Sequence, residues 1–316
     1  MQQRTVGPAE LSLTASVARR YYFDGASKRD IAADLQLSRF KVARLLEQAR
    51  ASGLVRIELD YRGELDLDLS VRLRTAYGLR YCTVIDSDTD DEVLLRANVG
   101  HAAARLLAEV LNADDVVGLA WARSLVAMQT SHSRLAACPV VQLTGALQRS
   151  DTECSCVDLV RDVAGASGGP SYFFYAPLIV PDAATAQALR TQPEIARTMA
   201  RFGDVTKAVV GVGAWHKGQS TVADAVTDDE WRQMHHLGVR AELGGIQLDA
   251  DGAPIHTSLT ERLIGITARE LQAVPDVLAV VYGTANAGAV QAAVRGGFVS
   301  SLITHTAMAD ELLNRA

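Results

Sequence analysis

The segment from Ser27 to Gly53 constrains the fold more than any other, because its pattern predicts two short helices joined by a tight corner. One side of the first helix is apolar, through Ile31, Ala32 and Leu35. Gln36 and Leu37 form the predicted corner, and the hydroxyl of Ser38 is suited to cap the second helix. The second helix buries an apolar stripe made of Val42, Leu45, Leu46 and Ala49.

Cationic side chains face outward from the first two turns of the second helix, at Arg39, Lys41 and Arg44. Long donors here suit a recognition helix, whose first residues meet base edges and phosphates in the major groove. An ordinary helical hairpin would also carry solvated charges, but the capped corner and the apolar stripe favour DNA. The predicted DNA-binding residues, some of which hold phosphates, are Ser27, Lys28, Arg29, Ser38, Arg39, Phe40, Lys41 and Arg44. A wing-like strand is predicted at Val55–Leu59.

Charge is unevenly distributed along the 316 residues. Residues 1–60 hold ten Lys or Arg and seven Asp or Glu, a net of +3; the whole chain carries −6, so residues 61–316 carry −9. A basic amino-terminal part on an acidic remainder suits a DNA-reading module joined to a second domain. We therefore expect a DNA-binding domain at 1–60, a linker and connector helix at 61–79, and an effector-binding and oligomerisation domain at 80–316.

The sequence shows no signal peptide and no apolar run near the roughly 18 residues needed to cross a bilayer, which predicts a cytoplasmic protein without membrane contact. Its four cysteines are too few for a disulfide framework. Cys154 and Cys156 lack the neighbouring ligands of a metal site. Neither a dinucleotide fingerprint nor a P-loop lysine is present. The sequence thus predicts no metal and no cofactor.

From Arg80 onward, short β-rich apolar segments alternate with amphipathic ones. The predicted strands are Tyr81–Ile85, Val116–Ala120, Val140–Leu143, Ala208–Val212, Val277–Tyr282 and Val299–Ile303. The predicted helices are Leu67–Tyr77, Val93–Leu111, Leu125–His132, Val157–Ala164, Asp228–Leu237, Ala287–Arg295 and Thr306–Asn314. This alternation predicts an α/β fold with a parallel sheet covered by helices on both faces. Nearer the amino terminus, we expect a loose tail at Met1–Leu11 and a helix at Leu13–Phe23.

Ligands of such sheets bind at the carboxyl ends of the strands, where loops lead into helices. Four loops of this kind carry small or polar residues: Gly118–Ser124, Gln142–Ala146, Gly211–Ala214 and Gly283–Gly288. In the first loop, Arg123 and Ser124 offer donors to an anion, and Trp121 offers a flat face to a sugar ring. Small residues after a strand often form ordinary turns, but four such loops in one unit favour a phosphate-bearing small molecule.

Taken together, these motifs resemble the SorC/DeoR-type sugar-responsive transcriptional regulators of bacteria, over roughly Leu13 to Leu313. The family's amino-terminal pattern corresponds to Tyr21–Ile57, and its carboxyl-terminal pattern to the strand-end loops and Val299–Thr304. The resemblance implies a winged helix-turn-helix and a Rossmann-like effector domain related in fold to sugar-phosphate isomerases and deaminases. It also implies operator DNA and a sugar, polyol or sugar-phosphate effector as partners, and assembly as a homodimer or homotetramer.

The resemblance further implies which residues bind the effector. The family's GxxWGRT loop corresponds to Gly118–Ser124, and its TGG loop to Thr144–Ala146. Its acidic residue for sugar hydroxyls corresponds to Glu242, and its common Asp after LIT is replaced by His305. The predicted effector-binding residues are Trp121, Arg123, Ser124, Thr144, Gly145, Ala146, Gly213, Glu242, Asn286 and His305.

Asn286 departs from the family, which has a phosphate-binding Lys at this position. An amide brings only neutral donors where Lys brings a full charge. Arg123 makes a phosphorylated effector the slightly favoured expectation, and an unphosphorylated sugar or polyol is the alternative.

An enzyme of the isomerase or deaminase class is the competing function, and it would need a general base. Glu242 and His305 are the only candidates for that base, and such an enzyme would have no use for the outward cations of the second helix. The sequence therefore predicts a regulator and not an enzyme.

Overall fold

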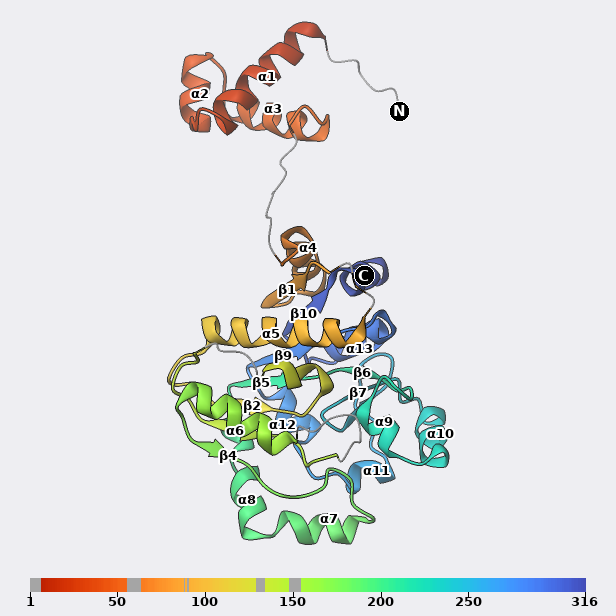
Figure 1. Ribbon diagram of the computed structural model, residues 1–316. Coiled ribbons are helices and arrows are strands. Elements are labelled where there is room, and N and C mark those ends of the chain that lie inside the picture. Colours follow the sequence, from red (N-terminus) through yellow and green to blue (C-terminus); the bar gives the residue numbers. More distant parts are fainter. Residues whose placement is uncertain (1–6, 56–63, 88, 90, 129–133, 148–154) are drawn as a thin grey trace. The chain divides into compact units, whose positions relative to one another are not determined.

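The computed structural model describes residues 7–55, 64–87, 89, 91–128, 134–147 and 155–316 (Figure 1). Contacts divide the chain into two units, Met1–Asp60 and Tyr61–Ala316. We call them the head and the body and describe each by itself. The wing-like strand predicted at Val55–Leu59 lies, apart from its first residue, outside the described residues, as do Cys154 and residues 61–63 of the predicted linker.

Three helices form the described part of the head: α1 Pro8–Tyr22, α2 Lys28–Asp34 and α3 Arg39–Ala51. The predicted pair of short helices is confirmed. The tail predicted at Met1–Leu11 is wrong at its end, because α1 already begins at Pro8. Proline suits the first turn of a helix, and Glu10 there interacts favourably with the helix dipole.

The corner between α2 and α3 forms as the sequence predicts. Gln36 adopts a left-handed conformation with φ of +53°, and the Leu37 backbone N–H donates to the Ala32 carbonyl at 2.9 Å. The Ser27 and Ser38 hydroxyls cap α2 and α3. The predicted stripe of α3 joins a closed apolar core made of Val17, Ala18, Ile31, Ala32, Val42, Leu45, Leu46 and Ala49. The head thus presents α3 on a small packed support.

Replacing Ser38 by Ala is expected to destabilise α3 by about 1 kcal/mol. The Lys41 backbone N–H, 3.1 Å from the Ser38 hydroxyl, would lose its acceptor. Faster hydrogen exchange of the α3 amides in the full chain, followed by mass spectrometry, checks this. Ser52→Ala is the matched control, because the Ser52 hydroxyl bonds to the Ala49 carbonyl at the other end of the helix. Equal acceleration in both variants would contradict the capping role.

The body is built on a seven-stranded sheet of order β1-β10-β9-β5-β2-β3-β4. Its strands are β1 Tyr81–Ile85, β2 Val117–Leu119, β3 Val140–Gln142, β4 Ser171–Tyr172, β5 Lys207–Val210, β9 Asp276–Val280 and β10 Ser301–His305. All neighbouring strands are parallel. The predicted α/β class is confirmed, and each predicted strand lies within two residues of the observed one at both ends. β4 was not predicted.

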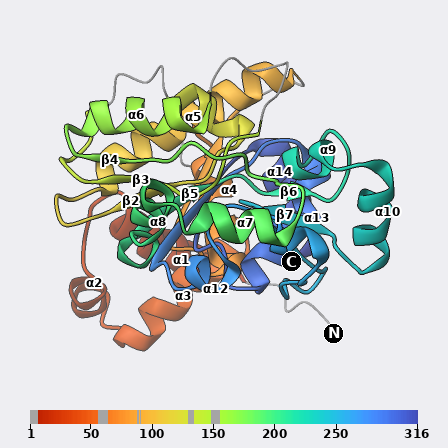
Figure 2. The same cartoon turned by 90° about the horizontal axis from the view of Figure 1, so that it is seen from below.

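Helices cover both faces of this sheet (Figure 2). One face carries α5 Glu92–Val110, α6 Cys156–Ser167 and the 3-10 helix η1 Arg123–Met128. The other carries α4 Leu67–Tyr77, α7 Ala183–Arg190, α8 Pro193–Met199, α12 Ala268–Gln272, α13 Ala287–Arg295 and α14 Thr306–Arg315. Alternate strand residues feed the two cores, as the period of two requires. In β9, Val277 faces the second core and Leu278 the first.

The first and last elements of the body are neighbours. β1 pairs with β10 from Tyr81 opposite Ser301 to Ile85 opposite His305. The Tyr77 hydroxyl at the end of α4 donates to the Leu312 carbonyl in α14 at 2.8 Å. The edge strand β1 and the connector helix α4 before it are therefore held by β10 and α14, the last two elements of the chain.

A small antiparallel sheet, β6 Gly213–Ala214, β7 Ala241–Leu243 and β8 Ile246–Leu248, was not predicted. It lies beside α9 Thr221–Ala225 and α10 Asp228–His236 (Figure 1). Strands of two or three residues are too short to show alternation. The remaining short elements are η2 Phe202–Asp204, α11 Ser258–Glu261 and η3 Thr284–Asn286.

One predicted helix of the body is a 3-10 helix in its described part. The described part of Leu125–His132 belongs to η1, which ends at Met128, and residues 129–133 lie outside the described ranges. Within the described part of the chain, no helix has both the length and the apolar character that a membrane crossing needs.

Candidate functional site

A cleft of about 460 Å³, partly open to solvent, lies at the carboxyl ends of β2, β5 and β9. After β2 the chain builds β3 and β4 on one side, and it then returns to place β5 on the other side of β2. Ligands of open α/β sheets bind at such a switch point, because the two flanking loops diverge there. The sheet topology therefore marks this cleft as the candidate site.

The loop after β2 forms one wall of the cleft through Trp121, Arg123 and Ser124, as the sequence predicts. The Ser124 hydroxyl donates to the Val280 carbonyl at 2.7 Å and ties this loop to the end of β9. At Gly211, in the facing loop, a Cβ atom would lie 2.4 Å from the Ala122 Cβ. The β2 and β5 loops thus approach each other as closely as a glycine permits.

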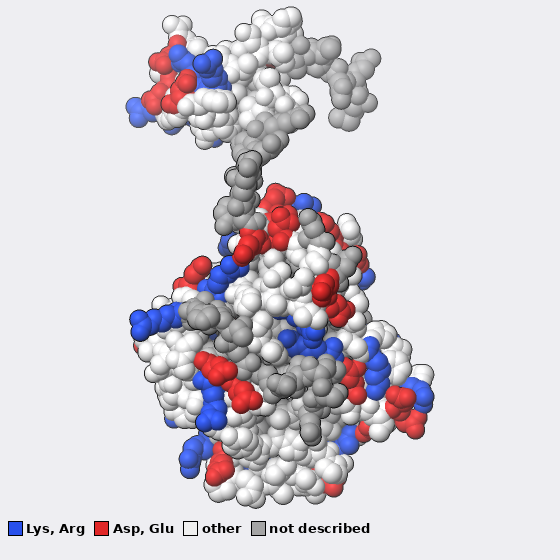
Figure 3. All heavy atoms as spheres, in the orientation of Figure 1, with Lys and Arg blue, Asp and Glu red and all other residues white. Residues whose placement is uncertain are grey.

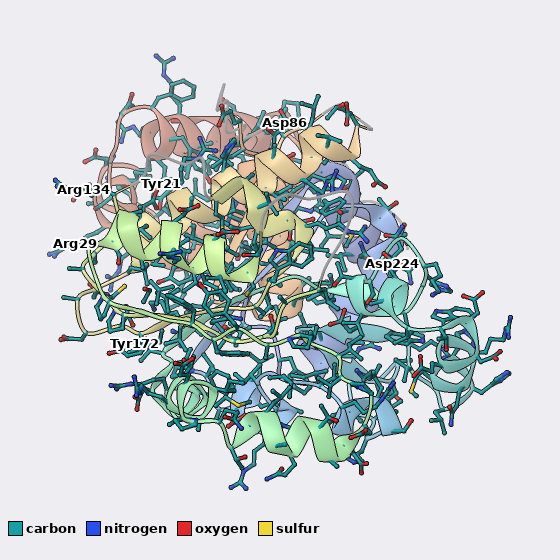
Figure 4. All side chains as sticks on the ribbon, turned by 60° about the horizontal axis from the view of Figure 1, so that its bottom comes forward. Tyr21, Arg29, Asp86, Arg134, Tyr172 and Asp224 are labelled. Carbon is teal, nitrogen blue, oxygen red and sulfur yellow. The ribbon has the colours of Figure 1, made fainter. Side chains whose placement is uncertain are left out.

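Arg123 is held by partners of its own protein. Its Nη2 contacts the Asp224 Oδ2 at 2.5 Å, and its Nη1 donates to the Gly218 carbonyl at 2.8 Å. The side chains of Arg123 and Asp224 are only 11% and 19% exposed. Figure 4 labels Asp224 on α9. Of the three guanidinium nitrogens of Arg123, Nε is the one that is buried without a hydrogen-bond partner among the described residues.

Glu242, in the middle of β7, contributes a buried carboxyl group to the cleft. Its Oε2 accepts from the Ser220 hydroxyl at 2.7 Å, and its Oε1 accepts from the Gly245 backbone N–H at 2.6 Å. Burial raises the pKa of Glu242 above its usual 4.5, and these two hydrogen bonds offset part of that rise. The carboxyl group is therefore fixed in place, and its burial favours the protonated form.

Asn286, at the start of α13, lines the cleft and is buried. Its Oδ1 accepts from the Ala214 N–H at 2.8 Å, and its Nδ2 donates to the Tyr282 carbonyl at 2.9 Å. The amide therefore joins the loops after β5 and β9. Gly213, also predicted, lines the cleft too, where a Cβ atom would lie 2.5 Å from the Gln219 carbonyl oxygen.

Four predicted effector-binding residues are not among those lining the cleft: Thr144, Gly145, Ala146 and His305. The Thr144 hydroxyl accepts from the Trp121 N–H at 3.1 Å and so holds the loop after β2 in place. Gly145 and Ala146 bond to the backbone of Ile264 and Ala176. His305 is buried, which lowers its pKa, and its Nε2 accepts from the Gly283 N–H at 3.1 Å. In this structure all four support the loops and do not face the cleft.

Four important residues were missed by sequence reasoning: Gln219, Ser220, Thr221 and Asp224. They belong to the loop after β6 and to α9, which together cover the cleft from the side of the small sheet. The Ser220 hydroxyl also caps α9 by accepting from the Ala223 N–H. A serine followed by Thr221–Ala225 is a helix-start signal that could have placed α9.

A second hollow opens on the other side of the β7–β8 hairpin and shares Gly244 with the cleft. Its polar lining groups are already bonded to backbone: Arg190 donates to the Leu263 carbonyl and Gln247 to the Gly245 carbonyl. It also lacks the strand-end loops. Among the described residues, no group of three or more His, Cys, Asp or Glu is arranged to hold a metal ion.

The head presents the residues predicted to bind DNA at the starts of two helices, α2 and α3. Arg39 and Arg44 are exposed, and Phe40 is 89% exposed, which is unusual for a large apolar side chain. Lys41 is half-buried, with its Nζ 4.0 Å from the Glu10 carboxylate of α1. On α2, Arg29 is exposed and the Lys28 ammonium lies over the Tyr21 ring. Figure 3 shows charges of both signs gathered over α2.

Comparison with known proteins places the body in a described family. Residues 61–314 match the family model "Putative sugar-binding domain". The chain is 27% identical to the transcriptional regulator LsrR of Klebsiella pneumoniae over 312 residues, which cover 96% of this chain and 94% of that regulator. It is 24% identical to LsrR of Escherichia coli K12, covering 94% and 93% of the two chains.

Solved structures share the fold. The full-length sorbitol operon regulator SorC of Klebsiella pneumoniae matches with a TM-score of 0.72 at 20% identity, covering 98% of this chain and 100% of that one. A domain of a possible sugar-binding transcriptional regulator from Arthrobacter aurescens matches with a TM-score of 0.69 at 22% identity, covering 81% and 100%.

Proposed function

This chain belongs to the sugar-binding domain family, and we propose that it is a SorC/DeoR-type transcriptional regulator whose operator affinity is set by a sugar, polyol or sugar phosphate bound in the body. The head reads operator DNA through α3. The effector binds in the cleft at the ends of β2, β5 and β9. Its binding changes operator affinity because the effector has different affinities for the DNA-binding and DNA-free states.

The observation that carries this proposal is the joining of two sites in one chain. The capped corner of α2 and α3 supports exposed cations and an exposed aromatic ring on the first turns of α3. The cleft of the body combines a fixed carboxyl group, hydroxyl groups and an indole, which are the groups that hold sugar hydroxyls and sugar C–H faces. The curated relatives that match nearly the whole chain are named as transcriptional regulators.

The geometry of the cleft gives less support to the isomerase or deaminase alternative. Glu242 and His305 were the candidate bases, but His305 does not line the cleft and its Nε2 is engaged by the Gly283 N–H. Glu242 stands in the cleft without a second carboxyl group or an imidazole among the described lining residues. General acid–base catalysis on a sugar needs both a donor and an acceptor of protons beside the substrate. The geometry therefore favours binding over turnover.

We further propose that the regulator acts in the cytoplasm as a homodimer or homotetramer. Paired heads would read a repeated or palindromic operator, since half-site spacing mirrors the symmetry of the protein. The domain division that we propose for function is a DNA-binding domain at 1–60, a linker and connector helix at 61–79, and an effector domain at 80–316.

The direct test starts by selecting DNA sites from a random pool with the full chain. Sugars, polyols and their phosphates are then screened for release of the selected site, followed by fluorescence anisotropy. We expect a selected palindromic or repeated site, and at least one compound that changes its affinity by about 5- to 150-fold. Failure to enrich any DNA sequence, or conversion of a sugar phosphate by the purified chain, would overturn the proposal.

A further inference from the structure

We propose that the cleft selects an uncharged sugar or polyol and rejects its phosphate ester, because Asp224 already neutralises the cation that a phosphate would need. This inference rests on the proposed function and names the chemical class of its effector. It reverses the slight preference for a phosphorylated ligand that the sequence alone supports.

Arg123 is the only Lys or Arg among the described residues that line the cleft. A phosphate that contacts the Arg123 Nη2 would compete with the Asp224 carboxylate, which already holds this nitrogen. Asp224 is not free to withdraw, because its Oδ1 accepts from the Gly218 N–H at 2.6 Å. Separating the pair would leave a largely buried carboxylate without its cation, which is far costlier than losing an exposed ion pair.

The summed charge around the cleft also opposes an anion. Arg123 and Asp224 cancel, and Glu242 adds a negative charge whenever it is ionised. The local sum is thus zero or −1, whereas a phosphate ester carries about −1.5 to −2 at pH 7. Two other cations of this region have partners of their own: the Arg96 guanidinium lies over the Tyr282 ring, and the Lys217 ammonium donates to the Val226 carbonyl.

Two neutral side chains at this edge are already hydrogen-bonded within the protein. The Asn286 Oδ1 accepts from the Ala214 N–H, and its Nδ2 donates to the Tyr282 carbonyl. The Ser124 hydroxyl donates to the Val280 carbonyl. These bonds reduce the number of side-chain donors that could replace the hydration of a dianion, and the Gln219 and Thr221 side chains that also line the cleft carry no charge.

An uncharged polyhydroxylated ligand meets matching groups instead. The Glu242 carboxyl group can accept hydrogen bonds from ligand hydroxyls, and the Thr221 and Gln219 side chains line the same cleft. Trp121 supplies an apolar face for the C–H side of a sugar ring. Hydroxyl groups can both donate and accept, so they can pair with the Glu242 carboxyl group and with the neutral side chains of the cleft.

The test compares wild type with Asp224→Asn, an isosteric change that releases Arg123 from its counter-ion. The probes are inorganic phosphate and matched pairs of neutral and phosphorylated compounds: ribose and ribose 5-phosphate, glucose and glucose 6-phosphate, and sorbitol and sorbitol 6-phosphate. Binding to the full-length protein is measured by isothermal titration calorimetry. Asp228→Asn is the matched control, because Asp228 is an exposed carboxylate on neighbouring α10 that lies 3.5 Å from Lys217.

We expect Asp224→Asn to bind inorganic phosphate about 10- to 100-fold more tightly than wild type, as one freed charge-assisted contact allows. The control should resemble wild type, and Arg123→Gln added to Asp224→Asn should remove the gain. In wild type, the neutral member of any pair that binds should bind more tightly than its phosphate. If Asp224→Asn does not fold, the test is decided by whether wild type binds the neutral or the phosphorylated member of a pair more tightly.

Tighter binding of a phosphorylated member to wild type, for example through backbone N–H groups at the start of α13, would overturn the inference. So would a folded Asp224→Asn that gains no affinity for phosphate. The proposed function fails on a separate result, the absence of any compound that changes DNA affinity. A gain of phosphate binding in Asp224→Asn would still support the inference about the cleft if no compound changed DNA affinity.

Discussion

The double variant Arg39→Ala/Arg44→Ala is expected to bind operator DNA roughly 10²- to 10⁴-fold more weakly than wild type, because each outward arginine contributes about 1–3 kcal/mol when it contacts a base edge. Both side chains are exposed on the first two turns of α3, and neither supports the head core. The change should therefore leave folding intact. Affinity is measured by anisotropy on a site selected by the wild-type chain.

The salt dependence of operator binding distinguishes arginine contacts to phosphates from arginine contacts to base edges. An arginine on a phosphate releases counter-ions, so its loss should reduce the slope of log affinity against log salt by about 1. An arginine on a base edge should instead relax sequence preference at one position. Arg50→Ala is the matched control, since Arg50 is an exposed arginine in the last turn of the same helix. If Arg50→Ala weakened binding as much as the double variant, α3 would not be reading DNA by its first turns.

Replacing Glu242 by Ala is expected to abolish the effector response and to destabilise the body by roughly 2–5 kcal/mol. The Gly245 N–H and the Ser220 hydroxyl would both lose a buried acceptor, and each such loss costs about 1–3 kcal/mol. The three tryptophans all belong to the body, so urea unfolding followed by tryptophan fluorescence reports on this unit. Operator binding without effector should persist wherever the variant is folded.

Glu242→Gln keeps the shape and removes the ionisation, so it isolates the charge. Burial raises the pKa of Glu242 in the folded body above the unfolded value. The stability that follows from this rise is fully present below the unfolded pKa and is lost as pH rises through the folded pKa. As pH rises from the unfolded pKa to the folded pKa of Glu242, the free energy of unfolding of wild type should therefore fall relative to that of Glu242→Gln. Urea unfolding at successive pH values measures this difference. Parallel stability curves for the two proteins would show that Glu242 does not titrate with a raised pKa.

The head could be predicted almost completely from its sequence, because each signal is local. Ser38 and its acceptor role, the corner at Gln36 and the buried stripe of α3 all lie within a few residues of one another. The parallel sheet was also predictable, since buried strand segments such as residues 277–280 of β9 are continuously apolar. The start of α1 was missed because its signals, Pro8 and Glu10, precede the first apolar residues.

The cleft was only partly predictable, because its decisive contacts join distant segments. Strand-end loops pointed to Trp121, Arg123 and Gly213, and a family resemblance pointed to Glu242. The sequence around Arg123 does not predict its partner Asp224, because Asp224 lies about a hundred residues away on a five-residue helix. Ser220 was missed for the same reason, since its partner Glu242 lies on a strand of three residues. Arg123 lies in a loop whose sequence suggests an anion site, but in the fold it forms an ion pair with Asp224, which neutralises the charge that an anion would need.

The pairing of β1 with β10 has a consequence for biosynthesis. Tyr81–Ile85 finds its sheet neighbour only when residues 301–305 have been made, and α4 gains its bond to Leu312 later still. The head, in contrast, has all its helices by Ala51. The described helices of the head are therefore synthesised long before α4 can contact α14. A chain that ended before Ser301 would keep all of these helices but would leave β1 without its neighbour in the sheet.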